Sequence, residues 1–149
     1  MWYSLGIMKP DCVERKLIDR VLSMIRRAGL KVVVVKMLSL TQDDIDIVYS
    51  RCKYKEFYSD MSAFLLSGDV CVYVIKGKNA INKLNMLVGE TDPKLASPST
   101  IRGELGESLR RNITHSSMNE ESFRREIEIF FTQEEIKSII FDPKVGEKY

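Results

Sequence analysis

A single histidine supplies the most versatile reactive side chain of this sequence. His115 is the only histidine among the 149 residues, and it lies within the run RNITHSS at positions 111–117. Because the unperturbed pKa of imidazole is close to neutral pH, this side chain can serve as nucleophile, proton carrier or metal ligand. Zinc sites usually need two or three nitrogen or sulfur ligands at short spacings, so a site built on imidazoles is nearly excluded. Any histidine chemistry must therefore take place at His115.

Polar and basic residues around His115 favour contact with phosphate. Hydroxyl and amide groups flank it, and three guanidinium groups precede it at Arg102, Arg110 and Arg111. The planar guanidinium group donates two hydrogen bonds at once, which suits phosphate oxygens. Two other interpretations stay open. A lone histidine near a strand end is often a half-buried structural residue, and two glutamates in the same stretch would fit a solvated loop of mixed charge.

A carboxylate at Glu126 could orient this histidine. Phe123 and Phe130 mark the apolar stripe of a helix expected over about 120–131, and Glu126 lies about 60° from the first and about 40° from the second. This position at the edge of the stripe favours a rim residue whose charge reaches water. The other interpretation is an orienting partner, since a carboxylate behind an imidazole fixes its tautomer and favours the charge that develops during attack.

The composition indicates a globular protein of one domain. Hydrophobic residues make up 44% and charged residues 30%, and 23 basic residues against 21 acidic ones leave a net charge of +2. This weak net charge argues against nucleic acid or a membrane surface as partner. The sequence lacks both GxxxxGK[ST] and GxGxxG, so nucleotide phosphates would have to be held by scattered side chains.

The cysteines and the first residues indicate a reducing compartment. Cys12, Cys52 and Cys71 are odd in number and form no CxxC pair, which favours free thiols. The N-terminal run lacks a basic leader, and no stretch approaches the length of a membrane span. The cytoplasm is therefore the expected location.

Hydrophobic periodicity predicts alternating strands and helices. The expected strands cover residues 2–8, 30–38, 70–75 and about 112–115; the expected helices cover 13–28, 42–49, 57–66, 80–88 and about 120–131, with one or two further turns after 132. The expected N-caps are Asp11 (with Glu14 in capping-box position), Thr41, Asn79 and Asn119, and glycines 29 and 89 are expected to end helices. Residues 90–114 show little periodicity and predict a structured functional loop. This order predicts a layered α/β or α+β sandwich without fixing which strands are parallel.

Several ordered motifs resemble those of the nucleoside diphosphate kinase family. MKPD at 8–11 resembles the family's IKPD, and TDP at 91–93 with PSTIRG at 98–103 resembles T-[DN]-P and PGTIRG. RNITHSS at 111–117 resembles RN-x-[IVT]-HGSD, and Glu126 falls where the family has a glutamate. The resemblance covers nearly the whole chain.

This resemblance implies a single nucleoside diphosphate kinase domain over residues 1–149. The implied fold is α+β, a ferredoxin-like sandwich with a four-stranded antiparallel sheet and helices packed on it. The implied reaction moves the γ-phosphate of a nucleoside triphosphate to another nucleoside diphosphate by a ping-pong route through phospho-His115. Mg²⁺ would be bound through the nucleotide phosphates, with no protein ligand for the metal. The family also implies a homo-hexamer or homo-tetramer, without membrane or specific nucleic-acid partners.

The resemblance assigns catalytic roles to five residues. His115 would be the nucleophile, with Glu126 and Ser117 orienting it. Lys9 would stabilise the moving phosphoryl group, and Tyr49 would lie beside the histidine.

It also assigns substrate contacts. Phe57 would stack on the base, with Met61 and Leu109 as apolar neighbours, and stacking on one face tolerates any base. The polar contacts would be Thr91 and Arg102 with phosphates, Lys9 and Asn112 with the sugar hydroxyls, and position Asn85, where the family usually has a phosphate-contacting arginine.

The sequence departs from the family pattern at several positions. Asn85 cannot make a forked ionic contact, so one charge-assisted hydrogen bond worth roughly 1.5–3 kcal/mol would be missing. The other departures are Ser99 and Ser116 for glycines, Met118 for an aspartate, and Lys16 and Asp19 for glycines of the first helix. We expect an active enzyme with weaker or altered nucleotide preference, in which an arginine at position 85 would tighten binding.

Three alternatives stay open. The chain could be a catalytically weakened relative that binds nucleotide or a partner for regulation. It could be a nucleic-acid-binding module, although the weak net charge and scattered aromatics argue against this. It could also be a histidine phosphocarrier fed by a partner protein, which would leave Phe57, Thr91 and Arg102 without a ligand.

Overall fold

The computed structural model describes residues 2–140, and within this range four strands form one antiparallel sheet. The strands are β1 (Tyr3–Met8), β2 (Lys31–Leu38), β3 (Val70–Lys76) and β4 (Thr114–Ser116), in the order β2-β3-β1-β4. Every neighbouring pair is antiparallel. The expected α+β sandwich with a four-stranded antiparallel sheet is therefore confirmed.

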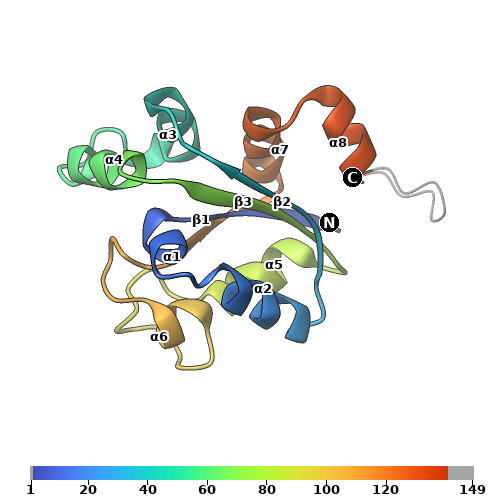
Figure 1. Cartoon of the computed structure of the whole chain (residues 1–149), viewed down its shortest axis with the longest axis horizontal. Coiled ribbons are helices and arrows are strands. Elements are labelled where there is room, and N and C mark those ends of the chain that lie inside the picture. The colour runs from blue at the N-terminus through green and yellow to red at the C-terminus, as the bar shows by residue number, and fades with distance from the viewer. Residues whose placement is uncertain (1, 141–149) are drawn as a thin grey trace.

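Helices cover both faces of the sheet (Figure 1). One layer holds α1 (Pro10–Glu14), α2 (Ile18–Arg27), α5 (Ala80–Val88) and α6 (Ile101–Leu105). The other holds α3 (Gln42–Val48), the 3₁₀ turn η1 (Ser50–Cys52), α4 (Tyr58–Leu66), α7 (Glu120–Phe130) and α8 (Gln133–Ile140). The strands and most helices lie where periodicity predicts them.

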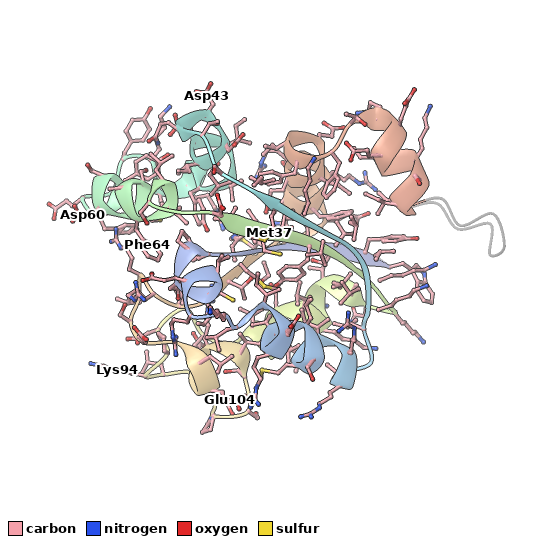
Figure 2. All side chains as sticks on the ribbon, viewed as in Figure 1. Met37, Asp43, Asp60, Phe64, Lys94 and Glu104 are labelled. Carbon is pink, nitrogen blue, oxygen red and sulfur yellow. The ribbon has the colours of Figure 1, made fainter. Side chains whose placement is uncertain are left out.

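Each helical layer shares a core with one face of the sheet. Successive residues of a strand point to opposite faces, and β3 supplies Val70, Val72 and Val74 to one core and Cys71, Tyr73 and Ile75 to the other. Side chains fill the space on both sides of the sheet, while charged groups such as Asp43 and Asp60 point outward (Figure 2). Burial on both faces explains why β3 reads as a continuous apolar run.

The prediction of one helix over 13–28 is wrong, and so is the Asp11–Glu14 capping box. The chain forms two helices there, broken at Lys16, whose φ is +56°. Asp11 is fully buried, and its Oδ2 accepts the backbone N–H of Ile113 at 3.0 Å. The carboxylate thus fixes the chain ahead of β4 and caps no helix, since Lys9 is the N-cap residue of α1.

The other helix ends mostly follow expectation. Thr41 and Asp44 form a full capping box at α3, and Asn119 accepts the N–H of Ser122 at the start of α7. Asn79 is the N-cap residue of α5, but its side chain caps no backbone group and accepts from Asn82 instead. Gly29 and Gly89 have positive φ values of 86° and 88°, which L side chains disfavour, and they end α2 and α5.

The long connection before β4 is ordered and contains α6. Arg102 on α6 donates to three backbone carbonyls, those of Gly89 at 3.1 Å, Asn112 at 3.3 Å and Thr114 at 2.8 Å. One guanidinium therefore ties both ends of the connection to the sheet. The expectation of a structured loop over 90–114 is confirmed.

Gly6 in β1 lets the side chain of Tyr73 in β3 reach across β1 to β4, the strand that carries His115. Gly6 pairs with Tyr73 on one side and with Ser116 on the other. The Tyr73 hydroxyl lies 2.9 Å from Thr114 Oγ1. A Cβ added to Gly6 would come within 2.1 Å of the Tyr73 ring. Only glycine allows this close approach, which attaches β3 to β4 across β1.

Cys12, Cys52 and Cys71 are free, as expected. Among residues 2–140, no helix has both the length and the apolar character needed to cross a membrane.

Candidate active site

A cavity of about 520 Å³ lies beside His115, between the α3–α4 region and the connection that leads to β4. The predicted site residues that line it are Lys9, Tyr49, Phe57, Asn85, Thr91, Arg102, Leu109, Asn112 and His115. Met61 lines it as well. The fold thus gathers around one hollow side chains that are far apart in the sequence.

Glu126 and Ser117 lie behind the imidazole. His115 Nε2 is 2.5 Å from Glu126 Oε1, and Ser117 Oγ donates to the same oxygen at 3.4 Å. Glu126 is only 1% exposed, so the interpretation as a rim residue is wrong. Periodicity gives the direction of the side chain but not its depth, and here the imidazole and hydroxyl satisfy a carboxylate that would otherwise be costly to bury.

The other ring nitrogen of His115 is left for the cavity. Nε2 is held by Glu126, whereas Nδ1 has no hydrogen-bond partner within residues 2–140. The side chain is 15% exposed, and the residue lines the cavity. The arrangement therefore presents one nitrogen to a ligand while a carboxylate fixes the ring from behind.

Tyr49 closes one side of the imidazole. The two ring centroids lie 5.3 Å apart with an interplanar angle of 62°, an edge-to-face contact. The Tyr49 hydroxyl is buried and has no hydrogen-bond partner in the described part of the chain. Burial raises the pKa of this phenol above its usual value, so the group stays a neutral donor.

Lys9 follows β1 and enters the cavity as a buried amine. Its Nζ donates to Asn112 Oδ1 at 2.6 Å, and Asn112 Nδ2 donates to the carbonyl of Thr91 at 3.0 Å. Burial, and then the positive charge of Arg102, lower the pKa of Lys9 to about 7. An anion placed beside this amine would stabilise its charged form.

Arg102 combines a structural role with an open side. Its three bonds to carbonyls leave two of the five guanidinium N–H donors for a ligand. Burial lowers the pKa of this guanidinium somewhat, but an arginine remains charged in proteins. A rigid cation therefore faces the cavity.

Exposed apolar side chains also line the cavity. Phe57 is 43% exposed and Leu109 is 63% exposed. An exposed aromatic ring beside a cavity offers a flat face on which a planar ligand can stack. The lining thus combines exposed apolar side chains with the polar groups around His115.

Arg51 is the one charged residue of the lining that the sequence did not single out. Arg110 donates to the Phe57 carbonyl at 3.4 Å, and Arg51 Nη1 lies 2.6 Å from Met118 Sδ. Asn85 accepts from Ser116 Oγ at 2.6 Å. The one feature of the sequence that could have pointed to Arg51 as a cavity residue is its position two residues after Tyr49.

The lining is cationic or neutral. Its charged residues are Lys9, Arg51, Arg102 and Arg110, and no Asp or Glu belongs to it. Within residues 2–140, no group of three or more His, Cys, Asp and Glu side chains is arranged to hold a metal ion. Such a surface suits a ligand that carries several negative charges.

Comparison with known proteins identifies a family. A family model described as nucleoside diphosphate kinase matches residues 3–136. The nucleoside diphosphate kinase of Thermoplasma acidophilum is 38% identical over 133 residues, which cover 89% of this chain and 90% of that protein. That of Picrophilus torridus is 40% identical over 132 residues, which cover 89% of this chain and 96% of that protein.

Solved structures agree with the sequence comparison. The apo nucleoside diphosphate kinase of Encephalitozoon cuniculi superposes with a TM-score of 0.86 at 32% identity, over 90% of this chain and 91% of that one. The Halobacterium salinarum enzyme in complex with CDP superposes with a TM-score of 0.85 at 32% identity, over 89% of each chain.

Proposed function

Because the chain belongs to the nucleoside diphosphate kinase family, we propose that it transfers a γ-phosphoryl group from a nucleoside triphosphate to a different nucleoside diphosphate through phosphorylated His115. One observation carries the assignment of the nucleophile. The imidazole is held at Nε2 by buried Glu126, and its Nδ1 is left for a cavity lined with cations. One such domain accounts for residues 1–149.

The first half-reaction begins with Nδ1 of His115. This nitrogen attacks the γ-phosphorus, and the bond from that phosphorus to the bridging oxygen breaks, so the diphosphate leaves with the electron pair. The ring becomes positively charged, and its Nε2–H donates to Glu126 Oε1, 2.5 Å away. In the second half-reaction a terminal oxygen of another diphosphate attacks the phosphohistidine and regenerates neutral imidazole.

Cations of the cavity would stabilise the moving charge. Phosphoryl transfer depends mainly on positioning and on electrostatic stabilisation. Lys9 and Arg102 line the cavity together with His115, and both can approach phosphate oxygens. Thr91 would add a hydroxyl contact to phosphate, and the Tyr49 hydroxyl would donate beside the reacting nitrogen.

Phe57 and Leu109 would hold the base, and Asn112 with Lys9 would meet the sugar hydroxyls. Stacking uses the face of the base and not its edge, so discrimination between bases would be weak. This predicts broad specificity for the nucleotide.

Magnesium would arrive as part of the substrate. Nucleotide kinases use a divalent metal, and Mg²⁺ prefers phosphate oxygens and water to protein cages. The cavity lining contains no carboxylate, which fits a metal held by the nucleotide. The ion would neutralise charge on the β- and γ-phosphates.

Family membership also supports a homo-hexamer or homo-tetramer and a cytoplasmic location. Strand β2 lies at one edge of the sheet, with Val35 and Met37 exposed. Sedimentation equilibrium would measure the subunit number.

A coupled assay tests the activity. ATP and a second nucleoside diphosphate are mixed with the protein, and formation of the second triphosphate is followed. Turnover supports the enzyme. Tight nucleotide binding without turnover would instead support the catalytically weakened relative.

A further inference from the structure

Arg51 lines the same cavity as His115, and its guanidinium group has no oxygen partner within residues 2–140. It belongs to η1, two residues after the tyrosine that packs on His115. Its Nη1 lies 2.6 Å from Met118 Sδ, and a thioether is only a weak acceptor. No carboxylate or carbonyl accepts from Arg51 among residues 2–140. Its strong donors therefore remain for a ligand.

The other cations of the cavity are already engaged with the protein. Lys9 donates to an amide oxygen, and Arg102 donates to three carbonyls. Arg110 donates to the carbonyl of Phe57. Arg51 thus differs from its neighbours, because none of its donors is used by a protein oxygen within residues 2–140.

Asn85 and Ser116 hold the segment that Arg51 contacts through Met118. Asn85 Oδ1 accepts from Ser116 Oγ at 2.6 Å, and Asn85 Nδ2 donates to the carbonyls of Ser117 at 3.1 Å and Met118 at 3.3 Å. These contacts use both ends of the amide. The side chain therefore fixes residues 116–118, and with them the sulfur that Arg51 contacts.

We propose that Arg51 binds the phosphates of the nucleotide. We further propose that Asn85 and Ser116 are positioning residues, because they hold the segment 116–118 whose Met118 sulfur contacts Arg51. This inference rests on the proposed function, because it assigns a further phosphate contact to the same cavity. It also changes the expectation for position 85. Asn85→Arg alone should not tighten binding, since it removes three hydrogen bonds that hold the 116–118 segment.

The first experiment compares two arginines that differ in their relation to the cavity. Arg51→Gln removes the proposed contact. Arg125→Gln is the matched control, because Arg125 lines a smaller adjacent cavity of about 210 Å³ together with Arg51 but does not line the large one. Calorimetry measures the affinity of each variant for ADP and for adenosine, which lacks phosphate.

Arg51→Gln should weaken ADP binding about tenfold, the effect of losing one hydrogen bond to a charged group, and should leave adenosine binding unchanged. Arg125→Gln should change neither affinity by more than about twofold. Equal ADP affinities for the two variants would overturn the proposal, and so would an equal loss for ADP and adenosine in Arg51→Gln. Arg51→Lys should recover part of the ADP affinity, since it keeps the charge but not the fork.

The second experiment tests the positioning role by a double-mutant cycle. In an Asn85→Ala background, Arg51→Gln should weaken ADP binding by less than about threefold, because the segment 116–118 that positions Arg51 is already released. The same coupling is expected with Ser116→Ala. A full tenfold loss in both backgrounds would overturn the positioning role.

Failure of the proposed function would look different. In that case the wild-type protein would bind ADP but form no labelled phosphoenzyme from ATP, whereas failure of the Arg51 inference leaves phosphoenzyme formation intact.

Discussion

His115 Nε2 and Glu126 Oε1 lie 2.5 Å apart, and the carboxylate that makes this contact is 1% exposed. The pair joins the short strand β4 to the middle of α7. A buried carboxylate is costly unless it is paired, so the contact serves both partners. It fixes the ring and leaves Nδ1 as the nitrogen available for chemistry.

Glu126→Gln should slow phosphoenzyme formation by about 10- to 100-fold, the effect of a lost charge-assisted hydrogen bond of roughly 1.5–3 kcal/mol. The amide keeps the shape but cannot stabilise the imidazolium that develops on attack. Rapid-quench kinetics with labelled ATP measures the rate. Glu128→Gln, an exposed position on the same helix, is the control and should stay within about twofold of wild type. Matching rates for the two variants would remove Glu126 from the mechanism.

Nucleotide binding should take up a proton at Lys9 above neutral pH. Burial lowers the pKa of the free lysine to about 7, and phosphate oxygens nearby raise it again in the complex. ADP affinity should therefore fall as pH rises through 7 toward 9, a range above the last phosphate ionisation near pH ~6. Calorimetry at pH 8 in buffers of different ionisation enthalpy measures the uptake. Lys9→Arg, which stays charged, should show none; equal uptake in both proteins would contradict this assignment.

The same lysine should make stability depend on pH. Its folded pKa of about 7 lies below its ordinary value of 10.5, so between these values the unfolded chain binds a proton that the folded chain does not. The contribution of Lys9 to the free energy of unfolding therefore increases as pH rises above 7, so the folded protein becomes more stable. Urea titrations at pH 6.5 and 8.5 should show this gain as a difference between wild type and Lys9→Met, and a pH-independent difference would speak against a lowered pKa.

Phe57→Ala should weaken ADP, GDP and CDP by similar factors. Loss of one stacked ring costs about 1–3 kcal/mol per base, equal to roughly 5- to 150-fold in affinity. Equilibrium binding with the three diphosphates measures the effect. Tyr54→Ala removes another aromatic ring that is 95% exposed and outside the cavity lining, so it should change little. A loss confined to one base would point to recognition of its edge.

Gly6→Ala should destabilise the fold by about 1–3 kcal/mol through overpacking. The added Cβ would come within 2.1 Å of Tyr73 Cζ. Gly68→Ala is the control, because its Cβ would meet Pro10 Cβ at an ordinary 3.5 Å. Urea denaturation measures both.

The close contact with Tyr73 also predicts coupling. In a Tyr73→Leu background the cost of Gly6→Ala should shrink, because the ring is gone. An undiminished cost would place the strain elsewhere in β1.

Local signals accounted for most of the secondary structure. The Thr41 and Asn119 caps were predictable because a cap depends on residues within three positions. Periodicity did not predict the break at Lys16, since Val13, Leu17 and Val21 continue a helical stripe across it. A positive φ at a lysine is unfavourable by itself, so the surrounding structure must hold it there.

The site shows the same division between local and distant causes. The resemblance of the motifs to those of the nucleoside diphosphate kinase family identified most of the functional residues that line the cavity around His115. The contact between Arg51 and Met118 joins residues 67 positions apart, and the bonds of Asn85 to residues 116–118 join residues 31 to 33 positions apart. No short-range pattern encodes such contacts. The depth of Glu126 was missed for the same reason, because it depends on where α7 packs.

The most direct test of the account uses ATP labelled in its γ-phosphate. The wild-type protein, incubated with this ATP and magnesium, should acquire a label that is labile in acid and stable in base, as expected of phosphohistidine. Addition of an unlabelled diphosphate with another base should move the label to that nucleotide, and His115→Ala should acquire none. Phosphoryl transfer without a labelled protein, or a label that persists in His115→Ala, would contradict a covalent route through this imidazole.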